Sequence, residues 1–142
     1  LQQADNSCGL AAMAYLLSRM GAGPTTEAAL KRALMPRYAA SAGHPPAAGY
    51  SLADLLWLGD RHGLMSKALK LPTEHLRGIN LPAILLLRPA RRSHFVVLDA
   101  LSRERARIFD PARGQLMLPR DRLVDDWLGG ETAGVLLQFE RR

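Results

Sequence analysis

The period of the apolar pattern changes once along the chain, at Gly63, and this change limits the possible folds more than any other feature. Before Gly63, apolar residues recur at steps of three and four, which is the period of helices. After it, short segments alternate or are apolar throughout, as strands do. Helices that precede an antiparallel sheet favour an α+β fold. The 142 residues contain no repeat and no linker, so we expect a single domain over residues 1–142.

The first part of the sequence predicts three helices, each begun by a capping residue and ended by glycine or proline. We expect them from about Cys8 to Met20 after Asn6 and Ser7, over residues 27–35 after Thr25 or Thr26 and before Pro36, and from the N-cap Ser51 to Gly63. Residues 37–48 are rich in Ala, Pro and Gly without periodicity, so they predict a mobile surface loop.

The second part predicts a sheet. Strands are expected over residues 64–71, 81–87, 93–100, 105–110, 115–118 and 134–140, with short helices over 73–77 and 121–128. The run Leu81–Leu87 is apolar throughout, which favours a central strand covered on both faces. The segment 93–100 is rich in β-branched residues and is expected to pair antiparallel with it.

Composition narrows the functional classes. Hydrophobic residues make up 48% and charged residues 23%, which is typical of a globular domain, and no apolar run approaches the ~20 residues of a membrane-spanning helix. The net charge is +6, but the basic residues are scattered and aromatics are only 6%. We therefore expect a solvated basic surface and no nucleic-acid partner, with some attraction to anionic lipid or acidic peptide.

Cys8 is the only cysteine, so an internal disulfide and a Cys-rich zinc site are excluded, and we expect no metal or organic cofactor. The predicted helix places Cys8 in its first turn, where unpaired amides and the helix dipole favour a thiolate. This is the chemistry of a nucleophile. The alternative is a small buried hydrophobic residue, which is the commoner role of a lone cysteine.

A nucleophilic cysteine needs a base, and the chain has four histidines. His44 lies in the predicted loop, His62 at a helix C-terminus and His75 in a short polar helix, and each has a structural interpretation. His94 differs because it begins an apolar strand directly after a basic turn, so a rigid element would hold it at the edge of the sheet.

Asp110 ends the strand 105–110 and precedes Pro111. An aspartate before proline often serves only to begin a turn, and this is the alternative interpretation. In an antiparallel meander, however, the start of strand 94–100 and the end of strand 105–110 lie at the same edge. His94 and Asp110 are then neighbours. In a cysteine hydrolase the imidazole moves the thiol proton and the carboxylate orients the imidazole. Gln2, six residues before Cys8, could form an oxyanion hole with the Cys8 amide, and Gln3 is the rival donor.

A set of motifs in this order resembles a known family, the bacteriocin-processing cysteine peptidases, which are papain-like bacterial domains. The motifs are Gln2, Ser7-Cys8-Gly9, Gly49 to Leu55, Leu81 to Ile84, Ser93 to Leu98, Phe109-Asp110-Pro111 with Gly114, and Trp127-Leu128-Gly129. The resemblance implies a papain-like fold with N-terminal helices packed on a C-terminal antiparallel sheet. It also implies a Cys8–His94–Asp110 triad with Gln2 in the oxyanion hole.

Members of this family often form the N-terminal domains of peptide-exporting transporters on the cytoplasmic face, where they cut leader peptides after Gly-Gly. Others stand alone, some in the periplasm with fibre-secretion systems. Ser7, where transporter-linked members commonly have Asp, and the long loop before Gly49 favour the stand-alone, periplasmic kind. Because the sequence starts at Leu1, we expect an excised domain or a processed product, monomeric in isolation.

The leading hypothesis is therefore a bacterial cysteine endopeptidase that cuts a secreted or exported polypeptide through a thioester, in association with an export system. One alternative is a binding module that guides a secretion substrate to its export apparatus; a thiol with an ordinary pKa of ~8.5 would favour it. Another is acyl transfer, in which an amine resolves the thioester and leaves a conjugate in place of a free carboxylate.

Overall fold

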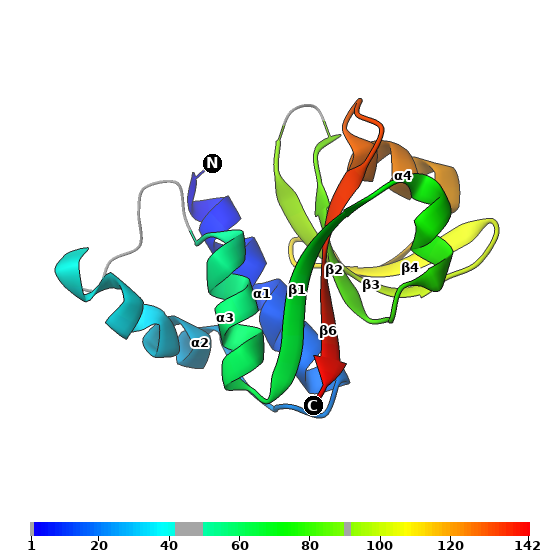
Figure 1. Cartoon of the computed structure of the whole chain (residues 1–142). Helices are drawn as coiled ribbons and strands as arrows, with labels where there is room; N and C mark the ends of the chain where they lie inside the picture. The colour runs from blue at the N-terminus through cyan, green and yellow to red at the C-terminus, as the bar shows by residue number, and fades with distance from the viewer. Residues whose placement is uncertain (1, 42–49, 90–91) are drawn as a thin grey trace.

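In the computed structural model, three helices cover one face of a six-stranded antiparallel sheet and a fourth helix lies on the other (Figure 1). The structure describes residues 2–41, 50–89 and 92–142, with residues 2–7 and 40–41 described by their backbone alone. The elements are α1 (Gln2–Arg19), α2 (Glu27–Leu34), η1 (Met35–Ser41), α3 (Leu52–Arg61), β1 (Leu64–Leu71), η2 (Thr73–Gly78), β2 (Ala83–Leu87), β3 (His94–Leu101), β4 (Arg105–Asp110), β5 (Gly114–Pro119), α4 (Arg120–Leu128) and β6 (Gly134–Arg141). The α+β fold expected from the sequence is confirmed.

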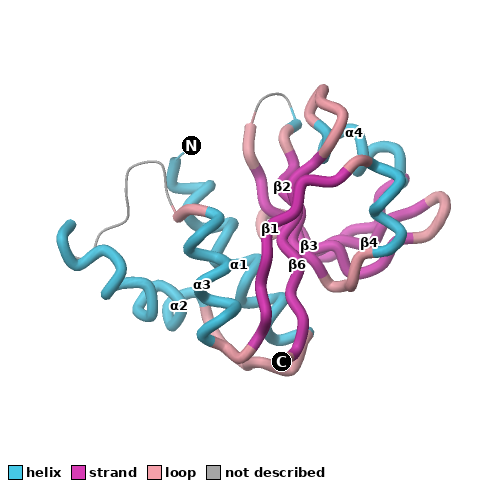
Figure 2. The backbone as a smooth tube through the Cα atoms, viewed as in Figure 1, coloured by secondary structure: helices cyan, strands magenta, loops and turns pink. Residues whose placement is uncertain are grey.

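The strand order is β1-β6-β2-β3-β4-β5, with every neighbouring pair antiparallel. β2 is central, and four of its five residues are buried, as its apolar run predicts. β3, β4 and β5 form the expected meander (Figure 2). The meander brings His94 at the start of β3 to the same edge as Asp110 at the end of β4.

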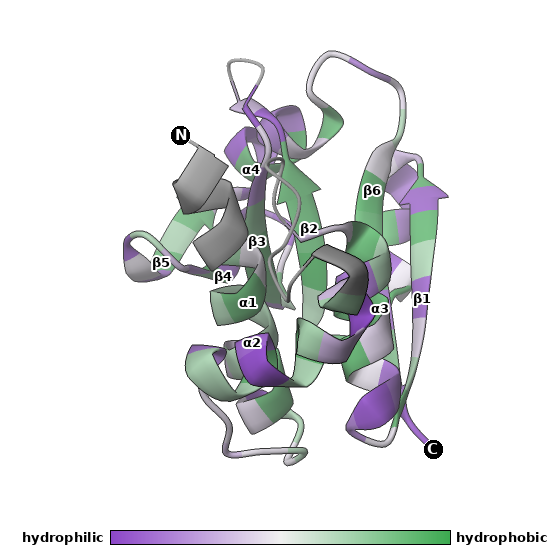
Figure 3. Ribbon diagram, turned by 90° about the vertical axis from the view of Figure 1, so that its left-hand side faces the viewer, coloured by the Kyte–Doolittle hydropathy of each residue, from purple (hydrophilic) through white to green (hydrophobic). Residues whose placement is uncertain are grey.

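Alternation along the strands divides the core into two layers, because successive side chains point to opposite faces. Ile84, Val97 and Leu137 pack with the apolar faces of α1, α2 and α3. Leu85 and Leu136 pack on the other side with Trp127 of α4. In Figure 3 the central strand β2 has the hydrophobic colour along its length. The sheet is therefore covered on both faces.

The start of α3 is fixed by Ser51, the N-cap that the sequence predicts, as part of a capping box. Ser51 accepts from the amide of Asp54, and the Asp54 carboxylate accepts from the amide of Ser51. Asp54 is 1% exposed and also accepts from Tyr38 and from Arg37, at 2.9 Å. Burial raises the pKa of Asp54, but the bonds from Tyr38, Ser51 and Arg37 outweigh it and lower the pKa overall. The charged carboxylate thus ties η1 to α3.

Two sequence-based predictions about helix boundaries are wrong. α1 begins at Gln2 and not after Ser7, and it ends at Arg19. Helix formers such as Gln and Ala in its first residues outweigh the capping tendency of Asn6 and Ser7, which is only a local preference.

The predicted loop after Pro36 is also partly wrong, because η1 runs through it to Ser41. α2 ends before Pro36, at Leu34. Because proline fixes φ near its helical value and is tolerated in a first turn, the backbone continues as η1. Residues 42–49, including His44, lie outside the described residues. No helix in the described part of the chain is long and apolar enough to cross a membrane.

The packing of α3 on the sheet depends on Gly59. A Cβ built at this position would lie 2.7 Å from the Phe139 ring and 2.2 Å from Ser66 Oγ. The helix therefore approaches β1 and β6 as closely as the backbone allows.

We predict that Gly59→Ala lowers the free energy of unfolding by about 1–2 kcal/mol, because overpacking exceeds the gain in helix propensity. Gly78→Ala is the matched control, since nothing lies within 4 Å of a Cβ there. Urea denaturation of both variants measures the difference. An equal effect of the two substitutions would contradict the close packing of α3.

Candidate active site

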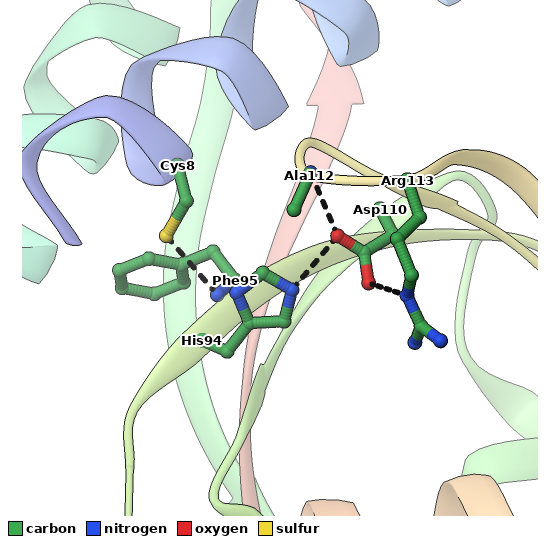
Figure 4. Close-up of polar contacts among 6 residues, drawn as sticks. All are labelled: Cys8, His94, Phe95, Asp110, Ala112 and Arg113. Atoms are coloured by element: carbon green, nitrogen blue, oxygen red, sulfur yellow. Dashed lines mark hydrogen bonds and ion pairs between the residues drawn. The ribbon is translucent and has the colours of Figure 1, made fainter. Parts of the chain in front are cut away.

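Cys8 lies on the face of α1 that packs against the sheet, and it is 6% exposed. Its Sγ accepts a hydrogen bond from the backbone N–H of Phe95 in β3, at 3.5 Å (Figure 4). Beside it, a Cβ on Gly9 would meet the side chains of Phe95 and Leu55 at 3.5–3.6 Å. The sulfur is thus held between the helix and the start of β3.

The longer α1 changes the expected source of thiolate stabilisation. Cys8 is the seventh residue of the helix and lies in its second turn, not in its first. In an α-helix each amide donates to the carbonyl four residues earlier, so the Cys8 N–H is directed at Ala4 and not at a substrate. The prediction that an N-terminal position activates Cys8 is therefore wrong. One donor that the structure does supply is the Phe95 amide, which comes from a neighbouring strand.

His94 and Asp110 are in contact, as the meander predicts. His94 Nε2 lies 2.9 Å from Asp110 Oδ1, and the two side chains are 26% and 3% exposed. An ionised carboxylate only accepts hydrogen bonds, so Nε2 carries the proton and Nδ1 is left as the acceptor. In Figure 4 this second nitrogen lies on the side of the ring toward Cys8.

Asp110 is held by three donors. Oδ1 accepts from His94 and from the Ala112 N–H at 2.8 Å, and Oδ2 accepts from Arg113 Nε at 3.3 Å. Burial raises the pKa of Asp110, but the Ala112 amide, His94 and Arg113 together lower it below its ordinary value. Asp110 therefore stays ionised while it orients the imidazole. Asp110 also begins the turn that its place before Pro111 predicts.

The two other histidines among the described residues lie elsewhere in the fold. His62 is the C-cap of α3 and donates from Nδ1 to the Leu58 carbonyl at 2.8 Å, and His75 is exposed in η2. Gln2 and Gln3 open α1, but their side chains lie outside what is described. Among the described residues, no group of three His, Cys, Asp or Glu side chains could hold a metal ion.

Two contributors were not predicted from the sequence. Arg113 could have been found, because it lies three residues after Asp110 in a predicted turn, within reach of the carboxylate. The Phe95 amide could not, because its contact with Cys8 joins residues 87 apart in the chain.

This arrangement can be compared with known proteins. The profile of the Peptidase C39 family matches residues 1–135. The chain belongs to this family. The probable functional amyloid protease FapD of Pseudomonas aeruginosa is 27% identical over 90% of this C39 domain and 56% of its own length. The colicin V secretion/processing protein CvaB of Escherichia coli is 32% identical over 65% of this chain and 14% of its own. The chain thus spans about half of FapD and a seventh of CvaB.

Solved structures share the fold of this C39 domain. The peptidase domain of Streptococcus ComA, from a bifunctional transporter, has a TM-score of 0.74 at 15% identity and covers 100% of this chain and 95% of its own. A double-glycine-motif protease from an AMS/PCAT transporter, solved with a leader peptide, has a TM-score of 0.71 at 22% identity and covers 95% and 84%. Their helices-on-sheet architecture matches the one described above.

The lowered pKa of Asp110 predicts a pH-dependent contribution to stability. A depressed carboxylate stabilises the fold above its unfolded value of about 3.9, and this contribution is lost as pH falls through the lower folded value. Asp110→Asn should cost about 1–3 kcal/mol at pH 7, and the difference from wild type should shrink as the pH is lowered toward 2. Guanidinium denaturation at several pH values measures it. Asp125→Asn, at an exposed position of α4, is the control; a constant Asp110→Asn difference from pH 7 to 2 would contradict the role of the charge.

Proposed function

We propose that this C39 domain is an active cysteine endopeptidase with Cys8 as nucleophile, His94 as general acid and base, and Asp110 as the group that orients His94. The observation that supports it most directly is the 2.9 Å contact between His94 and Asp110 beside a cysteine whose sulfur contacts the residue next to His94. α1 contributes Cys8, and the consecutive strands β3 and β4, far from it in the sequence, contribute His94 and Asp110. The family match supports the same assignment.

In the proposed reaction, His94 Nδ1 takes the proton of the Cys8 thiol, and Sγ attacks the carbonyl carbon of the scissile peptide bond. The tetrahedral intermediate collapses when the imidazolium returns the proton to the leaving amine, and a thioester remains on Sγ. Water, deprotonated by His94, then attacks the thioester and releases a free carboxylate. The thiol recovers its proton at the end of the cycle.

We propose Gln2 as a donor to the oxyanion of both tetrahedral intermediates. Its position six residues before Cys8, and the family resemblance, support this role. The backbone amide of Cys8 is less suited to share it, because the helical geometry directs that amide back along α1.

The proposed substrate is an exported bacterial polypeptide cut after two small residues. The double-glycine protease among the structural neighbours was solved with a leader peptide, and FapD is named a functional amyloid protease. We propose a stand-alone periplasmic enzyme rather than a transporter domain on the cytoplasmic face; Ser7 before the cysteine and the long segment before Gly49 support this choice.

The proposal predicts cleavage of a peptide with an apolar leader ending in Gly-Gly, and loss of cleavage by at least about 10³-fold in Cys8→Ala and His94→Ala. Mass spectrometry identifies the products. A peptide with Val-Val in place of Gly-Gly is the substrate control and should resist cleavage. Processing by Cys8→Ala at the wild-type rate would exclude the mechanism.

A peptide aldehyde ending in Gly-Gly tests the nucleophile separately from turnover. It should form a hemithioacetal with Cys8 in wild type and none in Cys8→Ala. If the wild type binds the leader but neither cleaves it nor adds the aldehyde, the domain is a binding module for a secretion substrate and not a peptidase.

A further inference from the structure

Tyr15 of α1 contacts all three strands of the β3–β4–β5 meander. Its ring stacks on Phe109 of β4 with centroids 4.1 Å apart and planes at 1°. Its hydroxyl donates to Asp99 Oδ2 of β3 at 2.5 Å, and it accepts from Gln115 Nε2 of β5 at 3.1 Å. No role in the proposed reaction requires these contacts.

The partners of Tyr15 are close in sequence to the catalytic groups. Tyr15 follows Cys8 by seven residues, which is two turns of helix, so the two side chains project from the same face about 10 Å apart along the axis. Phe109 directly precedes Asp110, and Asp99 lies on the strand that His94 begins.

The Asp99 carboxylate is buried where α1 packs on β3. Its side chain is 2% exposed and also accepts from Arg19 Nε at 3.3 Å, so α1 supplies both partners of the carboxylate. The pairing of β3 with β4 shifts register at this residue, between Leu98 and Ala100. A register shift of this kind re-aims a side chain, and here Asp99 is aimed at α1.

We propose that Tyr15 is a positioning residue that sets the place of Cys8 relative to the His94–Asp110 pair. The inference rests on the proposed function, since it assumes that this pair activates the thiol. Apolar contacts between α1 and the sheet are non-directional and tolerate small shifts of the helix. The hydroxyl bonds of Tyr15 are directional, and a nucleophile and its base require a fixed distance. The 3.5 Å contact of Sγ with the Phe95 amide would be lost after a small shift.

The test is Tyr15→Phe, which keeps the ring on Phe109 and removes both hydroxyl bonds. The probe is iodoacetamide, which reports on one site because Cys8 is the only cysteine. Burial and the bond to Asp99 raise the pKa of Tyr15, so the phenol stays neutral between pH 6 and 8. Its ionisation therefore does not contribute to the pH dependence of the alkylation rate. We expect alkylation at pH 6.5 to slow about tenfold, a factor within the range for the loss of two net hydrogen bonds.

Tyr38→Phe is the matched control, because it removes a hydroxyl bond to a buried carboxylate of the same kind, Asp54, between η1 and α3. Its alkylation rate should stay within about twofold of wild type even if its melting temperature falls as far as that of Tyr15→Phe. Equal rates in Tyr15→Phe and wild type would overturn the proposal. So would parallel slowing in both variants, which would indicate a general loss of stability.

The variant Asp99→Asn tests whether Tyr15 positions Cys8 through its bond to Asp99. If Tyr15 acts through Asp99, the double variant should be no slower than the slower single variant. Additive effects would overturn that route.

Failure of the proposed function would look different. In that case the wild type itself would react as an ordinary thiol and slow steadily below pH 8.5. The positioning proposal would fall with it, because no activated thiol would remain to position. An activated wild type with an unaffected Tyr15→Phe would overturn the positioning role alone.

Discussion

The face of α1 that carries Cys8 packs directly on the first half of β3, and the rest of the site follows from this contact. It joins a residue near the start of the chain to one 87 positions later. The sheet is rigid where this happens, because the central strands are buried on both faces. α3 packs beside α1 and lies close to β1 and β6 at Gly59.

The site divides into a part built by local turns and a part built by tertiary packing. His94 and Asp110 meet because the single antiparallel connection between β3 and β4 brings them to one edge, and the turn after Asp110 supplies two further donors to its carboxylate. Cys8 reaches them only because a helix packs across the sheet. The Cys8 sulfur accepts a hydrogen bond from the Phe95 amide of β3. The N-terminus of α1, which the sequence suggested as the source of stabilisation, lies more than a turn away.

This division explains what could be predicted from the sequence. The strands, the N-cap at Ser51 and the contact of His94 with Asp110 depend on local pattern, and all were predicted. The start of α1 was not, because a capping preference of Asn6 and Ser7 is a weak signal against neighbouring helix formers. The contacts of Tyr15 were not predicted either. Its spacing from Cys8 marks it as a residue on the same helix face, but nothing local indicates that Asp99 is its partner.

The central claim is that Cys8 and His94 act as one ionising pair, and a direct measurement is the NMR titration of the protein labelled with ¹³C at the cysteine Cβ. A single resonance is expected, because Cys8 is the only cysteine. The account predicts that the thiol titrates well below the ordinary value of about 8.5, and that His94→Ala returns it toward that value. A wild-type thiol that titrates near 8.5, unchanged in His94→Ala, would contradict the account.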